Sequence, residues 1–208
     1  MKSAETTRSS RETRGLFSRL LRGVSLVQGS CGKRRKDNGY AVFGFEKKLT
    51  PLEMAAALVL LLKPSDQENP LLNDSAVSPD RVEEELACLR IFSLMYVAGP
   101  LLKDVDVKGR IFKEFYSRVT AGLDESEKLE FVRTMADREA AYSEAIQKSD
   151  DNCRFVESVG RAFARFCEAE GDPRVIATGA VEFAANCMFD RDAIQDILRQ
   201  YKVTPTSN

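Results

Sequence analysis

The stretch TPLEMAAALVLLL, residues 50–62, has the pattern of a short helix without a polar face. Thr50 is a typical N-cap residue, Pro51 fits the first helical position, and Glu53 stands where a capping box needs its acidic residue. Residues 54–62 are all apolar, so no side of this helix would face water. The stretch therefore predicts a buried helix at the centre of an all-α domain.

Helix start and stop signals continue to the end of the chain. Pro79 opens a helix that Gly99 and Pro100 are expected to end, and Asp124 with Glu127 forms a second capping box. The linkers between most helices are short, which predicts that consecutive helices pack as antiparallel neighbours. The pattern thus indicates an all-α, single-domain bundle of about seven helices. The helices expected after the first one cover about 78–97, 105–121, 124–148, 152–170, 172–188 and 190–201.

Periodicity also predicts which face of each helix points inward and whether the end of the chain is ordered. No convincing pair of alternating strands is found, and residues 202–208 are expected to be frayed. For the helix 124–148, the apolar stripe at helical spacing is taken as the side that packs on the core. That stripe consists of Leu129, Val132, Met135, Ala136, Tyr142 and Ile146.

Charge is divided unevenly along the chain. The net charge of the whole chain is −1, but residues 1–36 hold ten basic and two acidic residues, a net charge of +8. The remaining residues therefore have a net charge of −9. This contrast predicts a basic arm at 1–39, with an amphipathic segment at 14–27 and a flexible linker, followed by an acidic all-helical domain at 40–208.

The arm has the composition of a surface-docking segment. Its large apolar residues lie between 16 and 27, mostly on one side of a helix, with basic residues around them. Gly15 and Gly23 weaken this helix by about 1 kcal/mol each, so we expect it to form only against a surface. A run of four basic residues adds attraction to anionic lipid. The residues expected to dock are Leu16, Phe17, Arg19, Leu20, Leu21, Arg22, Val24, Lys33, Arg34, Arg35 and Lys36.

Several surfaces could receive this arm. An anionic membrane surface and an acidic protein partner both fit its charge. A cleaved organelle transit peptide has a similar composition, and a solubilising extension could dock on the acidic part of its own chain. Nucleic acid is a poor fit, because the acidic domain would repel phosphate and Phe17 is the arm's only aromatic residue.

Composition argues against most catalytic machinery. The chain has no histidine, which excludes Ser–His and Cys–His pairs and imidazole metal sites within it. The five cysteines include no CxxC pair, which is typical of free thiols in a reducing compartment. No glycine-rich phosphate loop is present, so the sequence predicts no catalytic residue and no cofactor.

Carboxylates offer only weak metal candidates. Asp150, Asp151 and Glu157 present oxygen ligands of the kind that Mg²⁺ prefers, but helix capping is the better explanation of the cluster at 150–152, and no metal is predicted. Residues 104–109 imitate the start of a calcium loop, yet Phe115 stands where the bidentate glutamate should be.

We therefore expect a non-enzymatic interaction or adaptor protein, cytoplasmic or peripheral at a membrane, whose arm docks on an anionic membrane surface or an acidic protein partner. The alternatives are a helical enzyme or hydrophobic-ligand carrier with carboxylates near an apolar cavity, and an organelle-targeted protein whose arm is removed. Homodimerisation is a further alternative, because one sequence does not show which apolar stripe is left uncovered.

Overall fold

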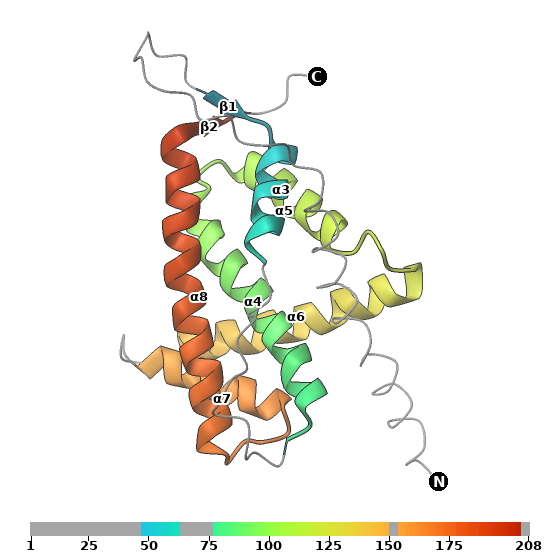
Figure 1. The fold of residues 1–208 in the computed structure, drawn as a ribbon, viewed down its shortest axis with the longest axis vertical. Coiled ribbons are helices and arrows are strands. Elements are labelled where there is room, and N and C mark those ends of the chain that lie inside the picture. Colours follow the sequence, from blue (N-terminus) through green and yellow to red (C-terminus); the bar gives the residue numbers. More distant parts are fainter. Residues whose placement is uncertain (1–46, 63–76, 150–153, 205–208) are drawn as a thin grey trace, which may run out of the picture.

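Six helices make up 81% of the part of the chain that the structure describes, which is residues 47–62, 77–149 and 154–204 of a computed structural model (Figure 1). The prediction of an all-α fold is confirmed. The helices are α3 (Pro51–Leu61), α4 (Pro79–Leu101), α5 (Val105–Val119), α6 (Glu125–Gln147), α7 (Arg154–Phe166) and α8 (Pro173–Gln200).

The helix count is six in these residues, and the prediction of about seven is wrong at the end of the chain. The expected helices 172–188 and 190–201 are one continuous helix, α8. Asp190 resembles an N-cap residue in the sequence, but its side chain is fully buried in the middle of α8 and pairs with Arg90 of α4. Asp190 therefore does not cap a new helix; its carboxylate pairs with Arg90 of α4 instead.

Two short strands close the ends of the described chain onto each other. Strand β1 (Lys47–Leu49) pairs in parallel with β2 (Tyr201–Val203), with Lys47 opposite Tyr201, and both strands lie at the same end of the molecule (Figure 1). The expectation that residues from 202 onward are frayed is wrong for the part that forms β2. Three residues are too few to show the period-2 pattern from which a strand is recognised.

Helix α4 runs past its expected end. It continues through Gly99 and Pro100 to Leu101, and the N–H of Leu102 still donates to the carbonyl oxygen of Ala98, over 3.0 Å. A proline in the last turn removes one intrahelical hydrogen bond without breaking the turns that precede it. Gly99 and Pro100 therefore lie in the last turn of α4 and not beyond the end of the helix.

Helix α7 ends earlier than expected, in a Schellman motif. Gly171 was expected to stop it, but the chain turns at Glu168, which has a φ of 60° in the left-handed region. The N–H of Glu168 donates to Arg165 over 3.0 Å, and the N–H of Ala169 donates to Ala164 over 2.8 Å. These are the two hydrogen bonds of the motif, with a glutamate where glycine is usual.

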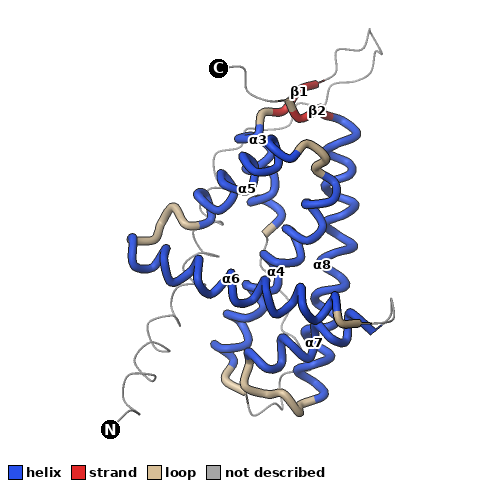
Figure 2. The backbone as a smooth tube through the Cα atoms, turned by 180° about the vertical axis from the view of Figure 1, so that it is seen from behind, coloured by secondary structure: helices blue, strands red, loops and turns tan. Residues whose placement is uncertain are grey.

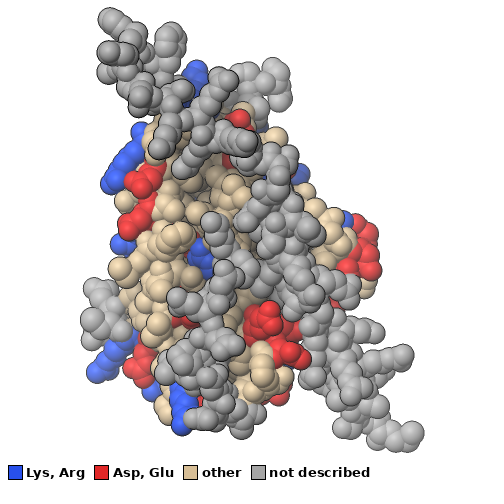
Figure 3. All heavy atoms as spheres, viewed as in Figure 1, with Lys and Arg blue, Asp and Glu red and all other residues tan. Residues whose placement is uncertain are grey.

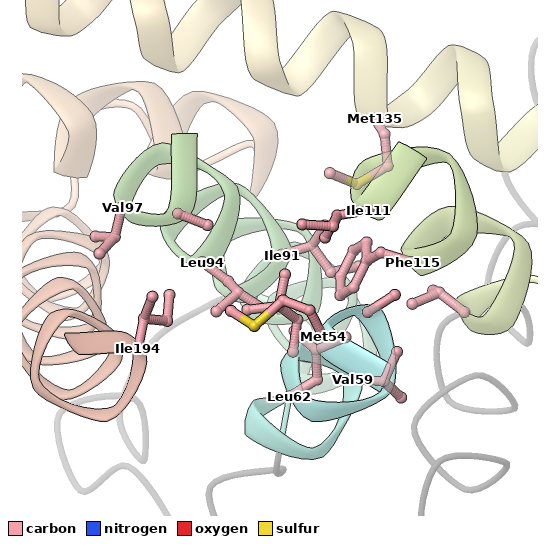
Figure 4. Close-up of a cluster of buried hydrophobic side chains, with 14 of the residues drawn as sticks. Met54, Val59, Leu62, Ile91, Leu94, Val97, Ile111, Phe115, Met135 and Ile194 are labelled. Carbon is pink, nitrogen blue, oxygen red and sulfur yellow. The ribbon is translucent and has the colours of Figure 1, made fainter. Parts of the chain in front are cut away.

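The first core cluster lies around α3, α4 and α5 (Figure 4). Met54 and Leu58 of α3 are fully buried, and Met54 lies among Ile91 and Leu94 of α4 and Phe115 of α5. Leu60, however, is 43% exposed. Helix α3 is therefore buried on one side only, and the expectation that it forms the centre of the domain is wrong.

The central helix is α4 instead, because it contributes more buried hydrophobic side chains to the two core clusters together than any other described helix. The second cluster joins α4 to α6, α7 and α8 through side chains such as Phe92, Tyr142, Phe163 and Phe183. Consecutive helices are neighbours from α6 to α8, whereas α3 packs on α5 and α4 packs on α8 (Figure 2). The expected packing of consecutive helices is thus found only in the second half of the domain.

Helices α7 and α8 approach each other at two glycines. A Cβ atom at Gly179 of α8 would lie 2.6 Å from the side chain of Phe163, and one at Gly160 of α7 would overlap the carbonyl oxygen of Ile176. No other residue type fits these positions without a shift of one helix, so glycine sets the separation of this pair.

A buried ion pair between Arg90 and Asp190 ties α3, α4 and α8 together. The guanidinium of Arg90 donates to both carboxylate oxygens of Asp190, over 2.5 and 2.7 Å, and to the carbonyl oxygen of Leu61, over 2.6 Å. The last contact satisfies a free carbonyl at the end of α3. Burial raises the pKa of Asp190, and the hydrogen bond and charge of Arg90 oppose this shift.

Removing one partner of this pair should be strongly destabilising. We expect Asp190→Ala to lower the free energy of unfolding by roughly 3–5 kcal/mol, because Arg90 would remain buried without a carboxylate. Urea denaturation followed by far-UV circular dichroism measures this change. The exposed Asp196→Ala serves as the control and should stay within about 0.5 kcal/mol of the native protein. A loss below about 1 kcal/mol for Asp190→Ala would contradict the role assigned to the pair.

At Glu168, the left-handed residue at the end of α7, we predict a substitution that stabilises the protein. Glu168→Gly should stabilise the protein by about 1 kcal/mol relative to Glu168→Ala, because glycine adopts a positive φ without strain. Both variants lose the contact between Glu168 and Arg81, which joins exposed groups 3.5 Å apart. Thermal unfolding compares the two variants, and equal midpoints would show that the turn is not strained.

Candidate functional site

The residues predicted to dock lie outside the described part of the chain. This holds for Leu16, Phe17, Arg19, Leu20, Leu21, Arg22, Val24, Lys33, Arg34, Arg35 and Lys36. Of the weak metal candidates, Asp150 and Asp151 also lie outside it. Glu157 is described and forms an exposed ion pair with Arg161, one turn further along α7, over 2.6 Å.

Many described carboxylates stabilise helix starts. Thr50 with Glu53 and Asp124 with Glu127 form the two predicted capping boxes. The side chain of Asp104 accepts from the N–H of Val107 over 2.9 Å, so the acidic residue that imitates a calcium loop caps α5. Within residues 47–62, 77–149 and 154–204, no group of three acidic or cysteine side chains is placed to hold a metal ion.

A second buried ion pair joins α4 to α6. Arg138 of α6 donates to Glu85 of α4 from both Nε, over 2.8 Å, and Nη2, and its guanidinium lies 3.8 Å from the ring centre of Phe166. Tyr142 lies one turn further along α6, fully buried against Phe92 and Phe166. This cluster holds one side of α6 firmly against the core.

The three described thiols are poor nucleophiles. Burial, reinforced by the negative charge of Glu85, raises the pKa of Cys88 well above its ordinary value. Burial likewise raises the pKa of Cys167 and of Cys187 to about 12. Nucleophilic cysteines require the thiolate, so these three groups have the environment of structural cysteines.

A surface pocket of about 310 Å³ opens where α4 and α8 begin and α7 ends. Arg81 reaches across this region and donates to the carbonyl oxygen of Phe166 over 2.8 Å. The lining contains acidic residues but no phenylalanine or methionine, unlike the apolar cavity expected of a hydrophobic-ligand carrier. The carrier alternative therefore stays a prediction. The pocket is lined by Val77, Ser78, Arg81, Cys167, Glu168, Ala169 and Asp172.

The outward side of α6 combines apolar and acidic side chains. Leu129 and Val132 are 52% and 55% exposed, and Ala136 is exposed between flanking carboxylates, so their assignment to the inward stripe is wrong. The true inward residues include Phe131, which sequence reasoning missed. With its N-cap, α6 has seven carboxylates and three basic residues. Figure 3 shows acidic side chains gathered at the tip where α6 begins.

The outward side of α8 is apolar in its middle. Val181 and Met188 are 60% and 70% exposed, and Phe189 is exposed beside them. Figure 3 shows uncharged surface along the middle of α8, with charged side chains toward its β2 end. A helix that leaves three large apolar side chains in water over nine residues is typical of a docking surface.

Comparisons with known proteins leave these surfaces as the best guide to function. No family model matches the chain, and no curated protein or solved structure is significantly similar to it. None of the described helices combines the length and the apolar content needed to cross a bilayer.

The state of the thiols can be tested directly. At pH 8, a thiol of pKa 12 has at least about 1,000-fold less thiolate than an ordinary cysteine. Iodoacetamide should therefore label Cys88, Cys167 and Cys187 far more slowly in the native protein than in urea, with Cys187, the most exposed of them, first. Peptide mass spectrometry locates the label. Rapid native labelling of Cys88 would contradict the structural role and favour a reactive thiol.

Proposed function

We propose that this protein is a non-enzymatic interaction module whose basic arm docks on an anionic membrane surface while its helical domain presents docking faces to protein partners. The observation that carries the proposal is the separation of charge, +8 in residues 1–36 and −9 in the rest. A chain divided in this way attracts anionic surfaces at one end and repels them at the other. The arm would then hold the domain close to lipid without drawing it in.

The described residues support the interaction part of this proposal. Carboxylates that could serve chemistry have structural contacts instead, since Glu85 and Asp190 pair with buried arginines and Asp104, Asp124 and Asp172 cap helices. Large apolar side chains are left exposed on two helices, α6 and α8. Exposed apolar area of this kind is more typical of binding surfaces than of the solvated face of a helix.

A membrane is favoured over an acidic protein by the form of the arm. Its apolar side is broad and includes Phe17, and it precedes a compact run of four basic residues, Lys33 to Lys36. An apolar helix face combined with a polybasic run is the pattern that peripheral proteins use on anionic lipid. Binding by the two signals together is stronger than by either alone.

Vesicle sedimentation with the full chain tests the proposal. We expect binding to vesicles that contain about 30% phosphatidylserine and little binding to phosphatidylcholine alone, with a steep loss at high salt. Neutralising Lys33, Arg34, Arg35 and Lys36 to glutamine should remove about 4 kcal/mol, nearly a thousandfold in affinity. Leu20→Glu should also abolish binding, whereas the matched control Leu129→Glu, on α6, should leave it unchanged.

Equal and negligible binding by all these proteins would refute the membrane proposal and favour an acidic protein partner. Intact mass of the protein from its native source separates the remaining alternative. Loss of the first 36 residues there would identify the arm as a cleaved targeting segment.

A further inference from the structure

Two opposite charges flank the apolar patch on the outward side of α8. Ala177, Val181, Ala185 and Met188 fall within an arc of about 80° at 100° per residue. Arg174, one turn before the patch, and Asp192, one turn after it, are exposed and lie within the same arc. Within this arc the apolar patch is therefore bounded by a basic residue on one side and an acidic residue on the other.

This arrangement is symmetric about residue 183. Arg174 and Asp192 each lie nine residues from that point, about 13 Å along the helix axis on either side. A second copy of α8 laid antiparallel across the first, with a twofold axis at residue 183, would place Arg174 opposite Asp192 of the second copy. The same pairing would occur again at the other end, because a twofold axis repeats every contact.

The apolar residues fit the same register. Val181 would lie opposite Ala185 of the second copy, so a branched side chain meets a small one at the centre. Met188, which is 70% exposed, would lie beside Ala177 of the second copy, whose small side chain leaves room for it. Alternation of large and small residues across a helix pair permits close approach of the two helices.

The half of α8 nearest β2 forms an outer edge of the molecule in both views of the backbone, while the end of α6 projects past α8 nearer its start (Figures 1 and 2). The whole segment from Arg174 to Asp192 lies inside α8, which runs from Pro173 to Gln200, so both helices would be continuous across the contact.

We propose that two copies of this chain form a symmetric dimer through antiparallel α8 helices, with Arg174 and Asp192 paired at both ends of an apolar seam. A second copy fits better than another partner, because a strongly acidic or basic partner would be repelled at one end of the face. The outward side of α6 lacks this balance. Its flanks are mostly acidic, so two copies of it would repel each other.

Charge reversal in the full chain tests both the dimer and its register. Sedimentation velocity over a concentration series should show a monomer–dimer equilibrium for the native protein. Arg174→Asp and Asp192→Arg, each alone, would bring like charges together at both ends of the seam, and each should weaken dimerisation by about tenfold or more. An equimolar mixture of the two variants should recover dimers, all of them mixed, because each variant supplies the charge that the other lacks.

Further variants separate this face from a general effect on folding. Met188→Glu should abolish dimerisation, whereas Val132→Glu, on the similarly exposed outward side of α6, should leave it unchanged. Recovery in the mixture also shows that both charge variants are folded. The proposal is overturned if the native protein stays monomeric up to about 100 μM, if neither single reversal weakens the dimer, or if mixing restores nothing.

Discussion

The arrangement of the helices depends on the hydrogen bonds that the guanidinium of Arg90 donates. This group donates to the carboxylate of Asp190 on α8 and to the carbonyl of Leu61 at the end of α3, so one side chain of α4 fixes two other helices. A buried ion pair of this kind contributes little net stability over a well-packed apolar pair, because both charges lose water. Its effect is on geometry, since α4 and α8 satisfy both charges only in one register. We therefore regard it as a determinant of which packing forms and not mainly of how stable that packing is.

Helix α4 repeats this principle on its other side. Glu85, which precedes Arg90 by five residues in α4, pairs with Arg138 of α6. The two pairs have opposite polarity, since α4 supplies the acid in one and the base in the other. Together they orient α6 and α8 so that one side of each helix meets the core and the other side is left for solvent or for a partner. The exposed faces of α6 and α8 are thus a direct result of buried charges on their opposite sides.

These same pairs explain where sequence reasoning failed. Caps depend on residues three positions apart, and both predicted capping boxes are present. The inward side of α6, by contrast, is Phe131, Met135, Arg138 and Tyr142, and the arginine interrupts its apolar pattern. The predicted stripe therefore joined the outward residues Leu129, Val132 and Ala136 to the buried residues Met135 and Tyr142. Asp190 misled in the same way, because a carboxylate inside a helix is usually solvated. The partners that bury these charges lie 53 and 100 residues away, beyond the reach of any local pattern. The docking residues of the arm were predicted from sequence alone and remain predictions.

The pairing of β1 with β2 has a consequence for the synthesis of the protein on the ribosome. The strand partners of residues 47–49 lie in residues 201–204, so this closure cannot form while the later part is still untranslated. At typical elongation rates the first strand waits on the order of ten seconds for the second. During that interval α4 also lacks α8, the helix on which it packs. A nascent chain in this state exposes the hydrophobic side of α4 that α8 later covers, which is the feature that chaperones recognise, and a stalled or shortened chain would keep that side exposed.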